Sequence, residues 1–215
     1  MKARLITNNE IPWWYENLLC DGFPENERKP VENIQALNRE GKYDIFVYED
    51  EGEAVGYATI WKKEGRDTYL LDYLGVPTKL RNNGLGAEIL KDIRDRVSEI
   101  ELAKNPLGAD GTPREICLIL ETETPEEGSE DAENEIRRRR RAFYERNGYI
   151  KIYEMGTCGV RFDTMSYETV PDDIEQVMKD HKEIYGPERY DVIVPLPAGE
   201  EPPLPFWMED RSNIH

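Results

Sequence analysis

The sequence is poor in the residues that build disulfide frameworks and metal sites. Among its 215 residues it has three cysteines and two histidines. Cys20, Cys117 and Cys158 form no CxxC pair and are odd in number, which predicts reduced thiols in a reducing compartment. The histidines, His181 and His215, show no metal-ligand spacing, so we predict no metal.

Long hydrophobic runs are also lacking. The longest purely aliphatic or cysteine run is Ile116–Leu120, far shorter than the roughly 20 residues of a transmembrane helix. No basic, apolar leader opens the chain. We therefore expect a cytoplasmic protein with no membrane partner.

Positive charge is scarce relative to negative charge. The chain has 28 lysines and arginines against 45 aspartates and glutamates, which leaves a net charge of −17. A surface this negative repels the phosphates of nucleic acids and attracts cationic solutes. We expect no nucleic-acid partner, and the excess of acid serves either the attraction of a cationic ligand or solubility alone.

Apolar periodicity predicts a mixture of strands and helices rather than a strict alternation. With 38% hydrophobic residues the chain can bury one sizeable core, with an extension rather than a second full domain. The expected strands cover residues 2–7, 43–48, 53–61, 68–76, 115–120, 149–153 and 160–167, and the expected helices cover residues 12–19, 31–38, 85–100, 132–146 and 172–185. Ser129 is the expected cap of the helix at 132–146, and the proline-rich tail from Gly186 is expected to pack as an extended arm. This order favours the α+β class, in which helices cover a mixed sheet.

One junction between a predicted strand and a predicted helix has two glycines close together, and so few side chains near its backbone amides. It reads LRNNGLGAEIL, residues 80–90. The unpaired N–H groups of a helix's first turn, together with the helix dipole, attract an anion. Gly84 and Gly86 leave those amides accessible, and Arg81 adds a planar donor. The junction therefore predicts a phosphate site, the alternative being a turn that binds nothing.

Two familiar phosphate loops do not fit this junction. No GK[ST] is present, which excludes the P-loop of ATP-binding proteins. The Rossmann fingerprint needs a small residue where Ile89 stands, which argues against a dinucleotide.

A second motif lies at the end of the predicted helix at 132–146. It reads RRRRRAFYERNGYI, residues 137–150, in which the pair FY is followed by a glycine and another aromatic residue. Together with the glycine loop it resembles the GNAT-type N-acetyltransferases, which use acetyl-CoA. That family carries [RQ]-x-x-G-x-[GA] after its fourth strand and F-Y-x-x-x-G-[FY] after its fifth, and here these are Arg81–Gly86 and Phe143–Tyr149. The segment FPENE, residues 23–27, resembles the FP-x-x-E of many bacterial members.

The resemblance covers about residues 2–167 and implies a fold. That fold is acyl-CoA N-acyltransferase-like and α+β, with three α/β/α layers and a mixed, mostly antiparallel sheet splayed in the middle. It predicts an acetyltransferase domain at residues 1–168. Residues 169–215 would form a C-terminal helix and a proline-rich extension packed on that domain.

The resemblance also implies how coenzyme A would bind. Its pyrophosphate would lie on the amides of residues 83–86, and its pantetheine arm would pair with the strand backbone, where a bulge at Gly75 opens the sheet. The N–H of Leu74 would polarise the thioester carbonyl. The expected cofactor contacts are Leu74, Val76, Arg81, Asn82, Asn83, Gly84, Leu85, Gly86, Arg137 and Tyr144.

The resemblance further implies direct transfer to an amine. Tyr144 matches the family tyrosine that protonates the departing sulfur, since a phenol is a donor near neutral pH. A carboxylate would take the proton of the incoming ammonium, with Glu121 and Glu123 as the best candidates and Glu27 as the third. Phe23 and Glu27 are expected to contact the acceptor. The alternatives are core packing for the tyrosine and a solvated surface charge for each acid.

One position departs from the family pattern, and two others carry expectations of their own. Arg137 replaces an asparagine found in many relatives, and would either bind a coenzyme phosphate or face solvent. Arg140 is the arginine expected on the inward face of its helix, together with Ile136. His181 falls on the apolar stripe of the terminal helix, where packing or a half-buried hydrogen bond is expected.

The resemblance thus implies an N-acetyltransferase that moves the acetyl group from acetyl-CoA to a primary amine by direct attack in a ternary complex. The expected acceptor is a small cationic molecule, while a peptide or protein amine and a homodimer stay open. One alternative is a non-catalytic acyl-CoA-binding regulatory module on the same fold. Another is an interaction protein in which the glycines only turn the chain.

Overall fold

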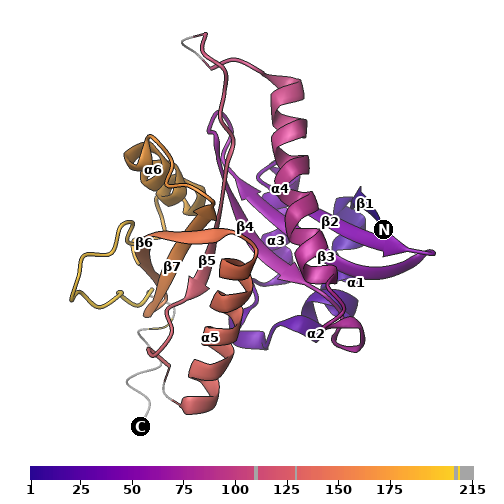
Figure 1. Ribbon diagram of the computed structural model, residues 1–215, viewed down its shortest axis with the longest axis horizontal. Helices are drawn as coiled ribbons and strands as arrows, with labels where there is room; N and C mark the ends of the chain where they lie inside the picture. Colours follow the sequence, from indigo (N-terminus) through magenta and orange to yellow (C-terminus); the bar gives the residue numbers. More distant parts are fainter. Residues whose placement is uncertain (109–110, 129, 206–207, 209–215) are drawn as a thin grey trace. The chain divides into compact units, whose positions relative to one another are not determined.

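The computed structural model describes residues 1–108, 111–128, 130–205 and 208. Its strands form a sheet in the order β1-β2-β3-β4-β5-β7-β6, accompanied by helices (Figure 1). The chain divides into two compact units, Met1–Gly65 with Leu71–Ile116 and Arg66–Leu70 with Cys117–His215. Strand β4, Thr68–Gly75, contributes residues to both units. The predicted α+β class with a mostly antiparallel sheet is confirmed, whereas the splay of the sheet and the domain boundary at residue 168 stay predictions.

The sheet of the first unit is built from the N-terminal strand and a hairpin. Strand β1 (Lys2–Leu5) pairs antiparallel with β2 (Tyr43–Asp50), which pairs antiparallel with β3 (Glu53–Lys62). Between β2 and β3, Glu51 and Gly52 have φ angles of 49° and 87°. Positive φ at both central residues is what a type I′ turn needs, and its twist suits a two-residue hairpin loop. The strands predicted at residues 43–48 and 53–61 are confirmed, and they form a hairpin.

The helices of the first unit are α1 (Ile11–Trp14), α2 (Cys20–Gly22), α3 (Val31–Arg39) and α4 (Leu85–Lys104). Tyr15–Leu19 forms a π-helical turn between α1 and α2, so helical backbone continues through residues 11–22. In α4 an apolar stripe is buried at Ile89, Ile93 and Val97, whereas Ile100 near the end of the helix is exposed. The stripe therefore packs only along the part of α4 that covers the sheet.

The elements of the second unit are β5 (Cys117–Glu123), α5 (Asp131–Arg146), β6 (Tyr149–Thr157), β7 (Val160–Tyr167) and α6 (Ile174–Tyr185). Strand β7 pairs antiparallel with both β5 and β6. Strand β5 extends three residues beyond the predicted end at 120, so that Glu121 and Glu123 lie within it. Because side chains alternate along a strand, these two acids share one face.

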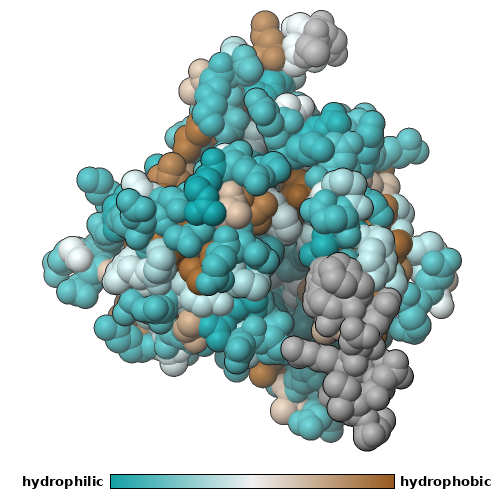
Figure 2. All heavy atoms as spheres, turned by 180° about the vertical axis from the view of Figure 1, so that it is seen from behind, coloured by the Kyte–Doolittle hydropathy of each residue, from teal (hydrophilic) through white to brown (hydrophobic). Residues whose placement is uncertain are grey.

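Buried apolar side chains occur in both units. Fully buried apolar side chains of the first unit include Ile11, Trp14, Leu19, Ile34, Tyr43, Ile45 and Val47, and those of the second include Ile119, Leu120, Met155, Met165 and Val192. The face seen in Figure 2 is mostly hydrophilic, with small and scattered apolar patches. This agrees with the 34% of charged residues in the sequence.

Helix α5 turns a different face inward from the one predicted. Ile136, expected to point inward with Arg140, is 57% exposed, whereas Arg137 and Tyr144 are buried. The prediction for this face was wrong because it followed the aliphatic residue. The buried face is decided instead by the ion pairs of Arg137 and by the ring of Tyr144, which packs edge-on at 6.1 Å from the ring of Tyr149. Ser129, the predicted cap of this helix, lies outside the described residues.

Candidate functional site

The glycine loop connects the end of β4 to the start of α4. After Gly75 the chain passes through a 3-10 turn, Thr78–Leu80, and enters α4 at Leu85. Asn82 and Gly84 have φ angles of 65° and 84°, the left-handed region that glycine adopts without strain. The strand, tight turn and helix predicted from the sequence are therefore present at this junction.

The start of α4 offers bare backbone donors. Residues 81–84 are exposed, and a Cβ atom at Gly84 would meet nothing within 4 Å. Within the described parts of the chain, no backbone carbonyl accepts a hydrogen bond from the N–H groups of residues 83–86, and the first bonded N–H is that of Ala87, at 3.0 Å from the carbonyl of Gly84. The 20-residue helix adds the positive end of its dipole. The loop is therefore suited to an anion such as a pyrophosphate.

Close packing accounts for two further glycines in this unit. A Cβ atom at Gly75 would lie 2.3 Å from Cζ of Tyr57, and one at Gly56 would lie 2.3 Å from Cδ1 of Ile89. Side chains at either position would collide with a buried ring or with the first turns of α4. Burial also raises the pKa of Tyr57. This packing explains why position 75 is glycine, while the bulge expected there stays a prediction.

Burial alternates from residue to residue at the end of β4, as expected for a strand with one face more accessible than the other. Leu74 and Val76 are half-buried, whereas Tyr73 and Gly75 between them are buried. Neighbouring residues of a strand point to opposite faces, so Leu74 and Val76 share the more accessible one. These are the two positions predicted to pair with the pantetheine arm.

Arg81 and Asp21 hold the turn that leads from β4 into the loop. Nε of Arg81 donates to the carbonyl of Val76 at 3.0 Å, which leaves this carbonyl one further lone pair for another donor. Asp21 of α2 accepts hydrogen bonds from the N–H and the hydroxyl of Thr78, at 2.7 and 3.0 Å. The backbone bond from Thr78 is the main cause that lowers the pKa of Asp21. The sequence did not predict the contact between Asp21 and Thr78, because these residues are 57 positions apart.

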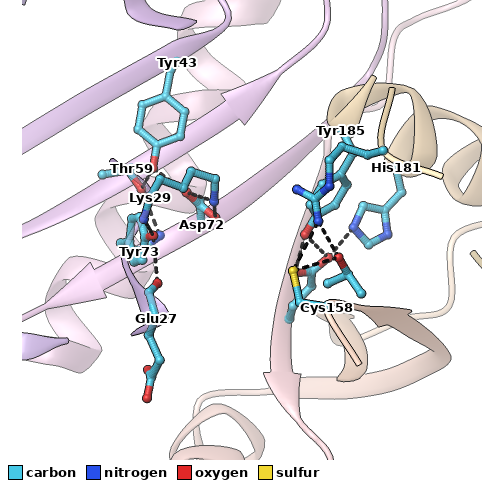
Figure 3. A network of polar contacts seen from close by, with 12 residues as sticks. Glu27, Lys29, Tyr43, Thr59, Asp72, Tyr73, Cys158, His181 and Tyr185 are labelled. Carbon is cyan, nitrogen blue, oxygen red and sulfur yellow. Dashed lines mark hydrogen bonds and ion pairs between the residues drawn. The ribbon is translucent and has the colours of Figure 1, made fainter. Parts of the chain in front are cut away.

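The segment after α2, predicted to bind the acceptor, is tied to β4 through Tyr73 (Figure 3). The ring of Phe23 packs edge-on against the ring of Tyr73, with their centroids 4.9 Å apart. The hydroxyl of Tyr73 donates to the carbonyl of Glu27 at 3.0 Å and accepts from the N–H of Lys29 at 2.9 Å. Phe23 and Glu27 are thus positioned by the strand that leads to the glycine loop.

Lys29 contributes a contact that the sequence analysis missed. Its Nζ lies 2.7 and 2.9 Å from the two carboxylate oxygens of Asp72, and 4.6 Å from the ring centroid of Trp61. The hydroxyl of Tyr43 also hydrogen bonds to Asp72. A carboxylate and an aromatic face together suit an ammonium group, here one supplied by the chain itself. No local signal marks this set, since it joins residues from β2, β3, β4 and a loop.

The two predicted base candidates in the second unit have different surroundings. Glu123 lies 3.5 Å from Nη2 of Arg137 and 3.4 Å from Nη1 of Arg140. Glu121 instead faces α6, where Nε2 of His181 lies 2.6 Å from Oε1 and the hydroxyl of Tyr185 donates to Oε1 and Oε2 at 2.9 and 2.8 Å. One acid is therefore held by cations and the other by hydrogen bonds from the C-terminal helix.

Tyr144 and Arg137 lie on the buried face of α5. The phenol ring of Tyr144 is nearly enclosed, and burial raises the pKa of its hydroxyl, so it stays protonated at neutral pH. Arg137 is 5% exposed, donates to the carbonyl of Thr124 at 3.3 Å and pairs with Glu133. The alternative in which Arg137 faces solvent is wrong, because these oxygen atoms draw its guanidinium inward. Its contact with a coenzyme phosphate stays a prediction.

His181 is the functional candidate that sequence reasoning undervalued. Its position on the apolar stripe of α6 predicted packing or a half-buried hydrogen bond, and the structure shows a fully buried ring that hydrogen bonds to Glu121. The available signal was its rarity, since the chain has only two histidines. What the sequence could not show is that β5 and α6, some 60 residues apart, meet at this ring.

Neither a metal site nor a membrane span is found among the described residues. No group of three or more histidine, cysteine, aspartate or glutamate side chains in these segments could hold a metal ion. No helix there is long and apolar enough to cross a bilayer.

Comparison with known proteins supports the resemblance of the motifs. Residues 41–151, just over half of the chain, match the family model described as an acetyltransferase (GNAT) domain. The matched region includes the glycine loop, β5 and the motif around Tyr144. Comparison with curated proteins finds no match.

Several solved structures share the fold. The chain is similar to a GNAT-family acetyltransferase from Bacteroides thetaiotaomicron, at 21% identity and a TM-score of 0.58, over 86% of this chain and 99% of that one. It is similar to an aminoglycoside 6′-N-acetyltransferase complexed with coenzyme A, at 16% identity and a TM-score of 0.51, over 80% and 100% of the two chains. A GNAT acetyltransferase from Elizabethkingia anophelis with acetyl-CoA bound matches at 12% identity and a TM-score of 0.50, over 78% and 97%. Identities this low show the fold alone.

Proposed function

The chain belongs to the GNAT acetyltransferase family, and from that premise we propose that it moves the acetyl group of acetyl-CoA to a primary amine by direct attack in a ternary complex. The observation that carries the proposal is the glycine loop, which is exposed at residues 81–84 and whose N–H groups at residues 83–86 donate to no backbone carbonyl in the described chain where the long helix α4 begins. The diphosphate of coenzyme A carries the charge that such a helix start attracts. Two of the similar structures were solved with coenzyme A or acetyl-CoA bound.

Tyr144 is the proposed general acid. A departing thiolate needs a proton or a hydrogen-bond donor, and a phenol whose pKa is raised by burial keeps its proton at neutral pH. In the described chain Tyr144 lies on the buried face of α5, where its orientation is set by the rings of Phe143 and Tyr149. The N–H of Leu74 is the proposed donor to the thioester carbonyl.

Glu121 is the proposed general base, in preference to Glu123. An attacking ammonium with a pKa of about 10.4 must first lose a proton, and a carboxylate can accept it directly or through water. Glu123 lies close to the guanidinium groups of Arg137 and Arg140, and these two positive charges would repel an incoming ammonium group. The side chain of Glu121 is 13% exposed and so remains in contact with solvent.

The proposed acceptor is a small cationic amine. The net charge of −17 would concentrate cations near the protein at low ionic strength. One of the similar structures is named as an aminoglycoside acetyltransferase, and aminoglycosides are polycationic amines. Phe23 and Glu27 are the side chains proposed to contact this acceptor, because β4 holds their segment in place.

Two measurements test the proposal. A thermal-shift titration with acetyl-CoA should raise Tm in a saturable way, because the ligand binds only the folded chain. An interaction protein whose glycines merely turn the chain would show no such shift. Release of free thiol across a panel of amines should then identify an acceptor. A protein that binds acetyl-CoA but releases no thiol with any amine would instead be the regulatory module.

A crystal grown with coenzyme A and a cationic amine would test the assignments residue by residue. The proposal expects the diphosphate on the amides of residues 83–86 and the sulfur next to the hydroxyl of Tyr144. A diphosphate bound elsewhere would overturn the loop assignment.

A further inference from the structure

The C-terminal helix α6 lies beyond the matched region at 41–151, yet it brings two polar side chains to β5. His181 is 0% exposed and Tyr185 is also buried, and both reach from the same face of the helix (Figure 3). Together they make three hydrogen-bond contacts with the carboxylate of Glu121, all between 2.6 and 2.9 Å. This concentration of donors on one carboxylate is not needed for α6 to pack.

An apolar stripe already attaches the helix to its unit. Val177 and Ile184 are buried on the same side of α6 as the two polar residues. Burying a polar group costs free energy unless a hydrogen bond compensates it, so a leucine or phenylalanine at 181 or 185 would serve packing more simply. The presence of His181 and Tyr185 at these buried positions therefore needs an explanation other than packing.

The chemistry of the contacts assigns the protons. An ionised carboxylate only accepts hydrogen bonds, so Nε2 of His181 carries a proton and donates it to Glu121. Nδ1 lies 3.1 Å from the hydroxyl of Tyr153, which donates to it when the ring is neutral. A neutral imidazole and a charged carboxylate thus satisfy these contacts together.

We propose that His181 and Tyr185 are positioning residues for the transfer reaction, which hold Glu121 ionised and in one orientation, so that α6 completes the base. This inference rests on the proposed function, because it takes Glu121 to be the base. Hydrogen bonds to a carboxylate favour its charged form. They also restrict the rotamers of a long side chain, whose partly exposed end must meet the substrate's proton.

Other titratable groups surround this set and must be separated from it. They are Cys117 on β5, Tyr153 on β6, Asp180 on α6, Arg66 just before β4 and Arg189 after α6. Burial raises the pKa of Asp180, whose carboxylate pairs with Arg66 at 3.3 Å. Asp180 is therefore the second acid whose protonation must be distinguished from that of Glu121.

The contact itself is tested without any activity. In protein labelled with ¹⁵N-histidine, only two imidazole rings give signals, and the His215→Asn variant assigns them. We expect the ring of His181 to carry its proton on Nε2 at neutral pH, with Nδ1 as the acceptor. A proton on Nδ1 instead would mean that Glu121 is protonated or turned away, and would overturn the inference.

The role in catalysis is tested by the pH dependence of kcat/KM. Tyr185→Phe removes one donor with little change in volume, and we expect kcat to fall about tenfold and the acid limb to move up by about one pH unit, because the carboxylate loses support for its charged form. His181→Gln keeps an amide donor near the place of Nε2 and should be affected less than His181→Leu. The Kd for acetyl-CoA should stay unchanged in all three variants.

Two further variants on α6 serve as controls. Lys179→Ala changes an exposed residue and should leave rate and pH profile as in the wild type. Asp180→Asn should leave the acid limb in place if Glu121 carries it. An acid limb that does not move in Tyr185→Phe, in a folded protein that still binds acetyl-CoA, would reduce α6 to a packing element and overturn the inference.

The failure of this inference and that of the proposed function give different results. If the wild type releases no thiol with any amine, the proposed function fails and the catalytic role of α6 fails with it, whatever the NMR spectrum shows. If the wild type is active but Tyr185→Phe leaves the acid limb of the pH profile unmoved, only the inference fails.

Discussion

The ammonium group of Lys29 lies 2.7 Å from Oδ1 of Asp72, which ties the segment after α2 to the strand that leads into the glycine loop. The side chain of Asp72 is 9% exposed and that of Lys29 is 24% exposed, so the pair is largely withdrawn from water. Removing one partner would leave the other charge poorly solvated. The pair therefore contributes both to stability and to the position of Phe23 and Glu27.

We expect Asp72→Asn to lower the free energy of unfolding by about 2 kcal/mol, somewhat less than for a fully buried pair because Lys29 still reaches water. Urea denaturation measures the change. Lys42→Met breaks the exposed pair of Lys42 with Glu40 and should cost less than about 1 kcal/mol. Equal losses of unfolding free energy in the two variants would show that the pair of Lys29 and Asp72 stabilises the fold no more than the exposed pair does.

Gly84→Val should weaken the binding of acetyl-CoA at least tenfold, because its side chain would enter the space in front of the exposed amides. The substitution also strains the backbone, since φ at this position is 84°. Gly65→Val supplies the control, because Gly65 has a φ of 73°, is exposed, and likewise has nothing within 4 Å of its Cβ position. Calorimetry should show lost affinity in the first variant only, and a similar loss in both would point to strain alone.

Tyr144→Phe should lower kcat about 100-fold while sparing the Kd for acetyl-CoA, because it removes the proposed proton donor and no cofactor-binding amide. Burial raises the pKa of Tyr144 above its usual value of 10.0, and Arg140 opposes this only in part. The phenol is the donor form, so a raised pKa keeps it competent at higher pH, and Tyr144 should cause no alkaline loss of activity below about pH 10. An alkaline limb near pH 8 that disappears in the variant would contradict this assignment.

A control for that variant lies in the same aromatic cluster. Tyr149→Phe removes a neighbouring phenol oxygen with the same change in volume. Its kcat should stay within about threefold of the wild type.

Asp191→Asn should destabilise the protein above pH 4 but not near pH 2. Burial would raise the pKa of Asp191, but hydrogen bonds from Arg189, the hydroxyl of Thr157 and the N–H of Cys158 outweigh it and hold the pKa at about 2, against 3.8 for the unperturbed group. A carboxyl group whose pKa is lower in the folded state than in the unfolded state stabilises the fold at pH values above its unfolded-state pKa. This stabilisation is lost as the pH falls from about 4 to about 2. The difference corresponds to about 2 kcal/mol.

Urea titrations between pH 2 and pH 7 measure this effect. The wild type should lose stability relative to Asp191→Asn across the acid window, until the two curves meet near pH 2. Asp172→Asn, at an exposed position of the same unit, should follow the wild type at every pH. Parallel curves for wild type and Asp191→Asn would exclude the charged network as the cause.

Local order was predictable because it depends on local chemistry. The type I′ turn at Glu51 and Gly52, the strand–turn–helix junction around Gly84 and the helix that ends before Gly148 each follow from residues adjacent in the chain. The same holds for the shared face of Glu121 and Glu123, which needs only that β5 continue through them. The motifs led from there to the family.

The inward face of α5 was not predictable in the same way. An aliphatic residue normally points inward, but Ile136 is exposed because oxygen atoms from distant residues draw Arg137 into the unit. Likewise nothing near His181 in the sequence indicates a carboxylate partner. Such choices depend on which charges meet after folding, and a helical wheel contains no such information.

The amino-acid sequence by itself determined the elements, their order and the bare amides at the start of α4, because turn chemistry and apolar periodicity act over a few residues. Only the tertiary structure gave Glu121 and Glu123 different neighbours, gave Lys29 its aromatic and acidic partners, and brought His181 to β5. Electrostatic and hydrogen-bond energies depend on distances between side chains, and those distances exist only once segments far apart in the chain have packed together.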